Sequence, residues 1–270
     1  MVRSVDAPGP SARGSDSETR SASVILNVIE VLRCFTADRP LQGVTEIAAR
    51  VGLHKSSVSR ILATLEQIDI VERDGESRKF RLGLGLIAVA GPLLANLDVR
   101  RLALPLLQDL STATGETIAL MVWSGYEAVT VEQVPSERQI KHVAPLGTRY
   151  GDATSASVQV FLAAMPAEQV RALLLSGLPS IPADGADGID GYLARLTACA
   201  ERGYAVNFGE TSPEEVGIAA PVRDHRGEVV AAVVLAAPFY RIDESAVPEL
   251  GAACARAAAQ ISTRMGAPLP

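Results

Sequence analysis

Residues 44–67 read VTEIAARVGLHKSSVSRILATLEQ, and this stretch decides the fold of the first part of the chain. Thr45 can cap a short helix over residues 46–50, because its hydroxyl can accept hydrogen bonds from the first free amides. Gly52 has the backbone freedom that a tight turn needs. A second helix follows from about Lys55. This order predicts a helix-turn-helix, in which the second helix enters the major groove of DNA.

The second of these helices has an apolar face and a polar face. Apolar residues recur at the spacing of one buried helix face: Val58, Ile61, Leu62 and Leu65. The start of the helix and its opposite face carry small hydroxyls, an imidazole and a cation: His54, Ser56, Ser57, Ser59 and Arg60. Such groups suit contacts with phosphates and base edges. Taken by itself, the segment could also be an ordinary two-helix hairpin with a solvated polar face.

A basic hairpin follows the second helix. Residues 70–73 predict a short strand, Asp74-Gly75-Glu76 a turn, and residues 78–82 the return strand. The hairpin carries four cations: Arg73, Arg78, Lys79 and Arg81. A charged hairpin is usually a solvated edge, but one placed directly after a recognition helix is typical of a wing that lies against the phosphate backbone.

Five short motifs carry a resemblance to a known family. They are RILATLE at residues 60–66, FRLG at 80–83, TGET at 114–117, GYAV at 203–206 and AAPV at 219–222. In this order and spacing they resemble the IclR-type bacterial transcription regulators, from about residue 23 to residue 265. The resemblance implies a dimerising linker helix and a GAF-like C-terminal domain with a pocket for small metabolites.

Composition limits the class of protein. The 270 residues are 48% hydrophobic, which is enough for two ordinary domains with full cores. Residues 1–20 are polar and lack an apolar core region, so we expect a disordered tail and no signal peptide. The three cysteines (Cys34, Cys199 and Cys254) are odd in number and far apart, as in reduced thiols of a cytoplasmic protein. No apolar run is long enough to span a bilayer, so we expect no membrane partner.

The net charge of −6 is unevenly distributed. Residues 21–82 hold nine Lys or Arg and eight Asp or Glu, whereas residues 83–270 hold thirteen and twenty. The acidic excess therefore lies outside the expected DNA-binding module. Because the local field governs phosphate contact, the total charge does not argue against DNA binding.

We expect four segments: a tail over residues 1–20, a winged helix-turn-helix domain over 21–82, a linker and dimerisation helix over 83–98, and an effector-binding domain over 99–268. The first helix, about residues 23–36, should bury five apolar side chains: Ile25, Val28, Ile29, Leu32 and Phe35. Residues 84–98 are too apolar for a free linker. Buried contact with a second copy explains them best, so we expect a homodimer or homotetramer.

The remaining chain alternates between helical and strand patterns. Helices are expected over residues 101–114, 154–164, 167–175, 189–202 and 244–265. Strands are expected over 117–123, 128–134, 216–223 and 228–237, with two hairpin turns between them. Hairpin strands with helices gathered between them favour an α+β class for this domain.

The motifs that could indicate other chemistry lack the partners that this chemistry needs. GLGLIA at residues 83–88 fits a dinucleotide fingerprint, but no βαβ unit follows and the acidic residue would be Asp109, inside a helix. His54, His142 and His225 are not at metal-ligand spacing, so we expect no metal and no cofactor. Asp152, Ser155 and Ser157 lack a base that would activate a serine, and Asp152 is expected to cap the following helix. We therefore expect no catalytic residues.

The resemblance also implies seven effector-contacting positions: His142, Ala156, Ser157, Asn207, Gly217, Val234 and Ala236. The family often has an acidic residue where Asn207 stands, Cys at Gly217, and Ser at Val234 and Ala236 in members that bind small acids. The usual ligand therefore does not transfer. Small apolar walls with few polar anchors suit an effector with an apolar or aromatic body. The alternatives are plain core positions, or a space filled by Trp123 or Phe208.

The sequence thus predicts a DNA-binding regulator that reads a palindromic operator and responds to a small-molecule effector. Two other hypotheses stay open. One is an enzyme with its active site in the C-terminal domain and a winged assembly module, and the other is a winged protein–protein interaction module. Salt-dependent binding to double-stranded DNA separates the three.

Overall fold

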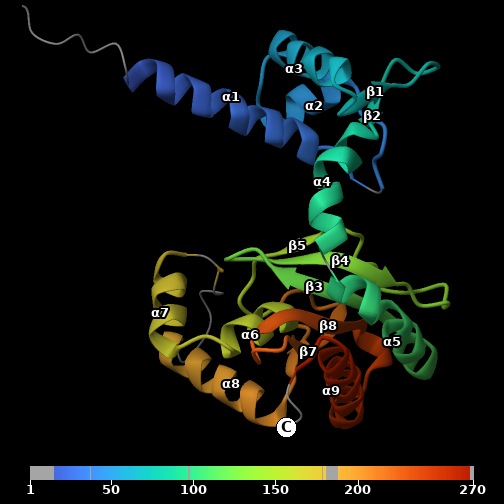
Figure 1. Ribbon diagram of the computed structural model, residues 1–270, viewed down its shortest axis with the longest axis vertical. Coiled ribbons are helices and arrows are strands. Elements are labelled where there is room, and N and C mark those ends of the chain that lie inside the picture. The colour runs from blue at the N-terminus through green and yellow to red at the C-terminus, as the bar shows by residue number, and fades with distance from the viewer. Residues whose placement is uncertain (1–14, 37, 97, 178, 181–187, 268–270) are drawn as a thin grey trace, which may run out of the picture. The chain divides into compact units, whose positions relative to one another are not determined.

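The computed structural model describes residues 15–36, 38–96, 98–177, 179–180 and 188–267 of the chain (Figure 1). The chain forms two compact units, residues 1–96 and 97–270. The first is a helix-turn-helix domain with a wing, and the second is an α+β domain. No helix within the described ranges is both long enough and apolar enough to cross a membrane.

The described residues of the first unit form four helices and a two-stranded sheet. In chain order these are α1 (Ser15–Arg33), α2 (Val44–Val51), α3 (Lys55–Gln67), β1 (Val71–Arg73), β2 (Phe80–Leu82) and α4 (Gly85–Asn96). Strands β1 and β2 are antiparallel, with Val71 opposite Leu82. Gln42 pairs with Phe80 by two backbone hydrogen bonds, which fastens the segment before α2 to the wing. Helix α1 begins at Ser15, inside the residues expected to form a tail.

The core of this unit lies between α1, α2, α3 and the wing. Its buried side chains include Val31, Phe35, Ile47, Leu62 and Phe80. The burial predicted for Ile25 and Ile29 is wrong, because these side chains are 64% and 42% exposed. Among the side chains of α1 that the structure describes, those that pack into the core come from the last turns of the helix.

Two glycines make the corner between the wing and α4. A Cβ on Gly83 would lie 2.2 Å from the backbone oxygen of Asp69, and one on Gly85 would lie 2.7 Å from it. The amide of Gly85 donates to that same oxygen at 2.9 Å. The GxGxxA pattern therefore reflects a close backbone approach that only glycine allows.

The second unit is a six-stranded antiparallel sheet between two layers of helices. Its elements are α5 (Asp98–Thr114), β3 (Thr117–Trp123), β4 (Ala128–Val134), β5 (Arg149–Tyr150), α6 (Ala156–Ala163), α7 (Ala167–Leu175), α8 (Gly188–Arg202), β6 (Ala205–Phe208), β7 (Glu215–Arg223), β8 (Val229–Pro238), η1 (Phe239–Arg241), η2 (Glu244–Ala246) and α9 (Val247–Arg264). The strand order is β5-β4-β3-β8-β7-β6. Helices α5 and α9 cover one face, and α6, α7 and α8 cover the other (Figure 1).

Alternation along the strands divides the core between the two faces. On β3, Ile118 and Leu120 pack with α5 and α9, whereas Ala119 and Met121 pack toward α6. The register places Gly217 of β7 between Asn207 of β6 and Ala236 of β8. Small residues at neighbouring register positions therefore leave room on the α6 side of the sheet.

Candidate DNA-binding surface and effector cavity

The recognition helix α3 presents the two faces that its sequence predicts. Val58, Leu62 and Leu65 are buried, and Ile61 packs against them from the edge of the core. His54 is the residue that precedes the helix. The polar residues on the other face are exposed, except for Ser57, which is partly covered: Lys55, Ser56, Ser57, Ser59 and Arg60. A continuous polar surface with cations thus lies on the outer side of α3.

The prediction that Thr45 is the N-cap of α2 is wrong. The helix begins at Val44 with Gly43 as its N-cap, so Thr45 already lies inside the first turn. Glu46 reaches back instead, and its Oε2 accepts a hydrogen bond from the Gly43 amide at 2.8 Å. A long side chain at this position can satisfy the N-cap amide, as in a capping box. Thr45 therefore remains exposed on the surface beside α3.

The basic residues of the wing are not equivalent. Lys79 Nζ lies 2.8 Å from Glu46 Oε1, and Arg81 Nε lies 2.5 Å from Glu72 Oε1. Arg73 lies over the Phe80 ring and 3.5 Å from Glu66. Within the described residues, no ion pair engages Arg78, which has a left-handed backbone with φ of 57° at the tip of the wing. Lys55 and Arg60 on α3 are likewise without an ion pair in that part of the chain.

In the second unit, the structure brings all seven expected effector positions around one cavity of about 30 Å³. They come from the loop after β4 (His142), the start of α6 (Ala156, Ser157), and strands β6 (Asn207), β7 (Gly217) and β8 (Val234, Ala236). Trp123 and Phe208 do not fill the space. Trp123 stacks on Phe161, and Phe208 packs edge-on against Phe239.

Six further residues that line this cavity were not among the expected effector positions: Met121, Ala144, Tyr150, Ser155, Glu215 and Val216. Tyr150 lies on β5, a two-residue strand too short for a periodic signal. Glu215 directly precedes the strand expected over residues 216–223, and the first residue of a strand carries no pattern of its own. Only the pairing of distant strands places these two residues at the cavity.

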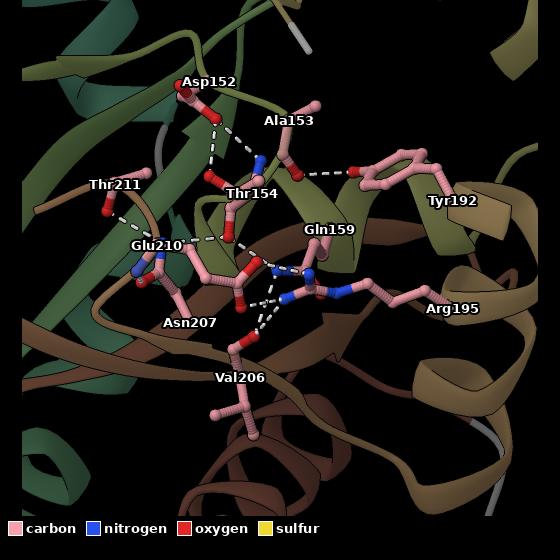
Figure 2. A network of polar contacts seen from close by, with 10 residues as sticks. All are labelled: Asp152, Ala153, Thr154, Gln159, Tyr192, Arg195, Val206, Asn207, Glu210 and Thr211. Atoms are coloured by element: carbon pink, nitrogen blue, oxygen red, sulfur yellow. Dashed lines mark hydrogen bonds and ion pairs between the residues drawn. The ribbon is translucent and has the colours of Figure 1, made fainter. Parts of the chain in front are cut away.

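Asn207 is occupied by hydrogen bonds within the protein (Figure 2). Its Nδ2 donates to the Thr154 carbonyl at 3.0 Å and to Thr211 Oγ1 at 2.7 Å. Its Oδ1 accepts from the Glu210 amide at 3.1 Å. A carboxylate could not make the two donations. The amide at this position therefore ties β6 to the start of α6.

A second buried amide extends this network. Gln159 Nε2 donates to the Thr154 carbonyl at 2.7 Å and to the Val206 carbonyl at 3.1 Å. Its Oε1 accepts from Arg195 Nε at 3.1 Å, and Arg195 is paired with Glu210 (Figure 2). The hydrogen bond from Arg195 to Glu210 raises the pKa of the guanidinium, which stays charged. The network joins α6, α8 and β6 on one side of the cavity.

Asp152 does not cap α6 as expected. Its Oδ1 accepts from the amide of Thr154 at 2.8 Å and from the Thr154 hydroxyl at 2.6 Å. The helix starts two residues later, at Ala156. Asp152 therefore closes the turn before the helix, and this turn presents the Thr154 carbonyl to both amides.

The other polar groups of the cavity form short local contacts. His142 Nδ1 lies 3.1 Å from Glu215 Oε2, and the Thr211 hydroxyl donates to Glu215 Oε1 at 3.1 Å. The hydroxyls of Ser155 and Ser157 are 3.1 Å apart. Burial, and then the charge of Glu215, raise the pKa of Tyr150 to about 12, so its phenol is neutral at ordinary pH. In the described part of the chain, no cluster of three or more metal-binding side chains is found.

Two family models match the chain. "IclR helix-turn-helix domain" covers residues 24–75, and "Bacterial transcriptional regulator IclR C-terminal" covers residues 92–263. The chain is 29% identical over 252 residues to the HTH-type transcriptional regulator KdgR of Dickeya chrysanthemi, covering 93% of this chain and 82% of that one.

Solved structures agree with these models. A domain of an IclR-family protein is 54% identical with a TM-score of 0.60, and covers 64% of this chain and 99% of that one. An IclR homologue from Microbacterium hydrocarbonoxydans in complex with 4-hydroxybenzoate is 26% identical with a TM-score of 0.72, and covers 90% of this chain and 98% of that one.

Proposed function

Because this chain belongs to the IclR family of bacterial transcriptional regulators, we propose that it binds a palindromic operator as a dimer or dimer of dimers. It is a regulator with an effector-binding C-terminal domain, and its partners are DNA and a small molecule. We assign residues 21–82 to operator binding, 83–98 to the linker and 99–268 to effector binding. Residues 1–14, in the expected tail, lie outside the described residues.

The operator-binding proposal rests on one observation, the group of unpaired cations on α3 and the wing tip. Lys55, Arg60 and Arg78 are exposed and free of ion pairs within the described ranges, so phosphates can bind them without breaking an existing contact. The full set of proposed contacts is Thr45, His54, Lys55, Ser56, Ser57, Ser59, Arg60, Arg73, Arg78, Lys79 and Arg81. In this set Arg73, Lys79 and Arg81 serve mainly to position the wing.

The exposed apolar side chains of the first unit support the dimer. Val24, Ile25 and Leu26 of α1 are each more than half exposed. So are Ile87 and Val89 of α4, and Leu84 just before it. The side chains of Leu93 and Leu94, and Leu97 as a whole, lie outside the described residues. Exposed apolar surface of this extent marks an interface, and two-fold pairing would present two recognition helices to a palindrome.

The effector proposal is a ligand with an apolar or aromatic body, bound at the cavity between α6 and the sheet. The lining from Ala156, Val234 and Ala236 is apolar and small. At about 30 Å³ the cavity holds only a water or two, so binding must widen it. The relative solved with 4-hydroxybenzoate supports a single-ring body as a starting point.

An enzymatic function of this cavity has less support. The hydroxyls of Ser155 and Ser157 contact each other, and within the described residues neither is hydrogen-bonded to His142. A serine nucleophile there lacks its base.

Titration of the chain against the duplex upstream of its own gene, at several salt concentrations, tests the function. We expect affinity that falls linearly with the logarithm of salt, with a preference for one palindromic segment. Binding that is weak at low salt and indifferent to sequence would contradict the regulator and favour the enzyme or the protein–protein module.

A further inference from the structure

Two hollows of the second unit meet at one pair of side chains. The effector cavity of about 30 Å³ and an outer groove of about 660 Å³ are both lined by His142 and Glu215. The groove is otherwise formed by residues 140–141, 212–214 and 238–240. His142 Nδ1 and Glu215 Oε2 are 3.1 Å apart, so this contact lies where the linings of the groove and the cavity overlap. A ligand that enters from the groove meets it first.

The cavity contains a carboxylate and no lysine or arginine among its described lining residues. Glu215 is the carboxylate, and about a quarter of its side chain is exposed. Its partners are His142 on one oxygen and the Thr211 hydroxyl on the other. Asn207, which could otherwise receive a ligand, has both its donors and its acceptor occupied. A polar ligand group inside the cavity therefore meets the Glu215 carboxylate beside the His142 imidazole, and no other carboxylate, lysine or arginine among the described lining residues.

We infer that Glu215 selects the effector by charge, so that the cavity takes a ligand whose head group donates an N–H, as an amine or an amide does. The ligand N–H replaces His142 as the partner of Glu215 Oε2, and the apolar body then contacts Ala156, Val234 and Ala236. This inference rests on the effector cavity proposed above and names the chemistry that it accepts.

A carboxylate head group has no comparable place. It would either share the His142 imidazole with Glu215, which places two carboxylates beside one ring, or displace Glu215 from His142, which leaves the two carboxylates facing each other without a partner between them. Like charges at this separation repel, and the repulsion grows as water is excluded. The neutral hydroxyls of Tyr150, Ser155 and Ser157 can donate hydrogen bonds to a ligand, but they do not supply the missing positive charge.

Two matched ligand series test the inference on the full-length protein. One is 4-hydroxybenzylamine, 4-hydroxybenzamide and 4-hydroxybenzoate, and the other is ethylamine, acetamide and acetate. Thermal shift and calorimetry compare the wild type, Glu215→Gln and the control Glu214→Gln, which removes a charge of the groove but not of the cavity. Glutamine keeps the size of Glu215 and can donate to an anion.

We expect the wild type and Glu214→Gln to bind the amine or the amide at least about tenfold more tightly than the carboxylate of the same body. The variant Glu215→Gln should lose the preference for the amine, and it should bind the carboxylate more tightly than the wild type does. The order of the ligand affinities on the wild type is enough to decide which head-group charge the site prefers, even if Glu215→Gln does not fold. Equal or tighter binding of the carboxylate by the wild type would overturn the inference, and so would the absence of a shift with every member of both series.

The variant Gly217→Val separates this inference from the location of the site. A Cβ on Gly217 would lie 3.6 Å from that of Ala156, so valine narrows the cavity without a clash of its first atom. If the carboxylate binds the wild type most tightly and Gly217→Val blocks its binding, the effector site stays at the cavity, but Glu215 does not select the ligand by charge. If Gly217→Val does not affect ligand binding, the effector site does not lie at this cavity.

Discussion

Lys79 Nζ of the wing lies 2.8 Å from Glu46 Oε1 in the first turn of α2. The hydrogen bond from Lys79 is the main cause that lowers the pKa of Glu46, so this carboxylate is ionised at neutral pH. The pair holds the loop end of the wing against the helix-turn-helix. It also occupies a cation that the sequence alone would assign to a phosphate.

The first prediction separates the two neighbouring cations of the wing. Arg78→Ala should reduce the slope of the logarithm of the binding constant against the logarithm of salt concentration by about 1. The reason is that an unpaired guanidinium at the wing tip releases about one counterion when it binds a phosphate. Lys79→Ala should change the slope less, because its ammonium is already paired with Glu46. Fluorescence anisotropy at several salt concentrations measures both slopes, and equal losses in the two variants would contradict the distinction.

The second prediction concerns the recognition helix. Arg60→Ala should cost about 1–3 kcal/mol of binding and relax the sequence preference at one operator position, if Arg60 reads a base edge. Lys55→Ala should weaken binding to all duplexes alike. A mobility-shift titration of the double variant provides the check. Affinity equal to that of the wild type would remove α3 from the interface.

The third prediction tests the dimer. Ile87 on α4 is 59% exposed within its own unit, so Ile87→Glu costs this unit little of its own core. It should nevertheless abolish operator binding, because it places two charges in a two-fold interface. Sedimentation of the wild type should show a dimer or tetramer. A monomeric wild type that still binds the palindrome would be incompatible with this interface.

The fourth prediction concerns the corner after the wing. Gly83→Ala should destabilise the first unit by about 1–3 kcal/mol, because the new methyl group overlaps the Asp69 carbonyl and the backbone must shift. Gly75→Ala is a matched control, since a Cβ there meets nothing within 4 Å. Amide hydrogen exchange of α3 and the wing measures the effect. Equal protection in both variants would show that the corner is adaptable.

The fifth prediction is a pH dependence. The folded chain holds Tyr150 neutral, with a pKa of about 12 against an ordinary 10. Its contribution to stability is therefore complete below pH 10 and is lost as the pH rises toward 12. Tyr150→Phe should reduce the fall in unfolding free energy across this range, whereas Tyr126→Phe, at an exposed position, should not. Denaturant unfolding at pH 8, 10 and 11.5 compares the three proteins.

Local patterns were sufficient for much of the fold. The helical spacing of Val58, Leu62 and Leu65 predicts the buried face of α3, and the structure confirms it. The strands expected over residues 117–123 and 128–134 match β3 and β4. Both signals depend only on neighbours in the chain, so no tertiary information was needed to find them.

The predictions that were wrong or incomplete depend on tertiary contacts, which the periodicity of the sequence does not describe. Ile25 and Ile29 share an apolar face, but the pattern does not say whether the module is wide enough to cover it. The choice of Gly43 over Thr45 as N-cap depended on the reach of Glu46. At the cavity, Glu215 and Tyr150 meet His142 only after the strands have paired, so no local rule could assign them to the site.

The carbonyl of Thr154 accepts hydrogen bonds from two buried amides on different elements, Gln159 and Asn207. Moving the start of α6 away from β6 would break the bond from Asn207 to the Thr154 carbonyl and the bond from Gln159 to the Val206 carbonyl, which is costly because it leaves buried polar groups without partners. Residues 135–148, by contrast, contain no helix or strand. We therefore expect a ligand that widens the cavity to displace the segment that carries His142 more than the α6 wall, so that the size of the ligand sets the displacement of that segment.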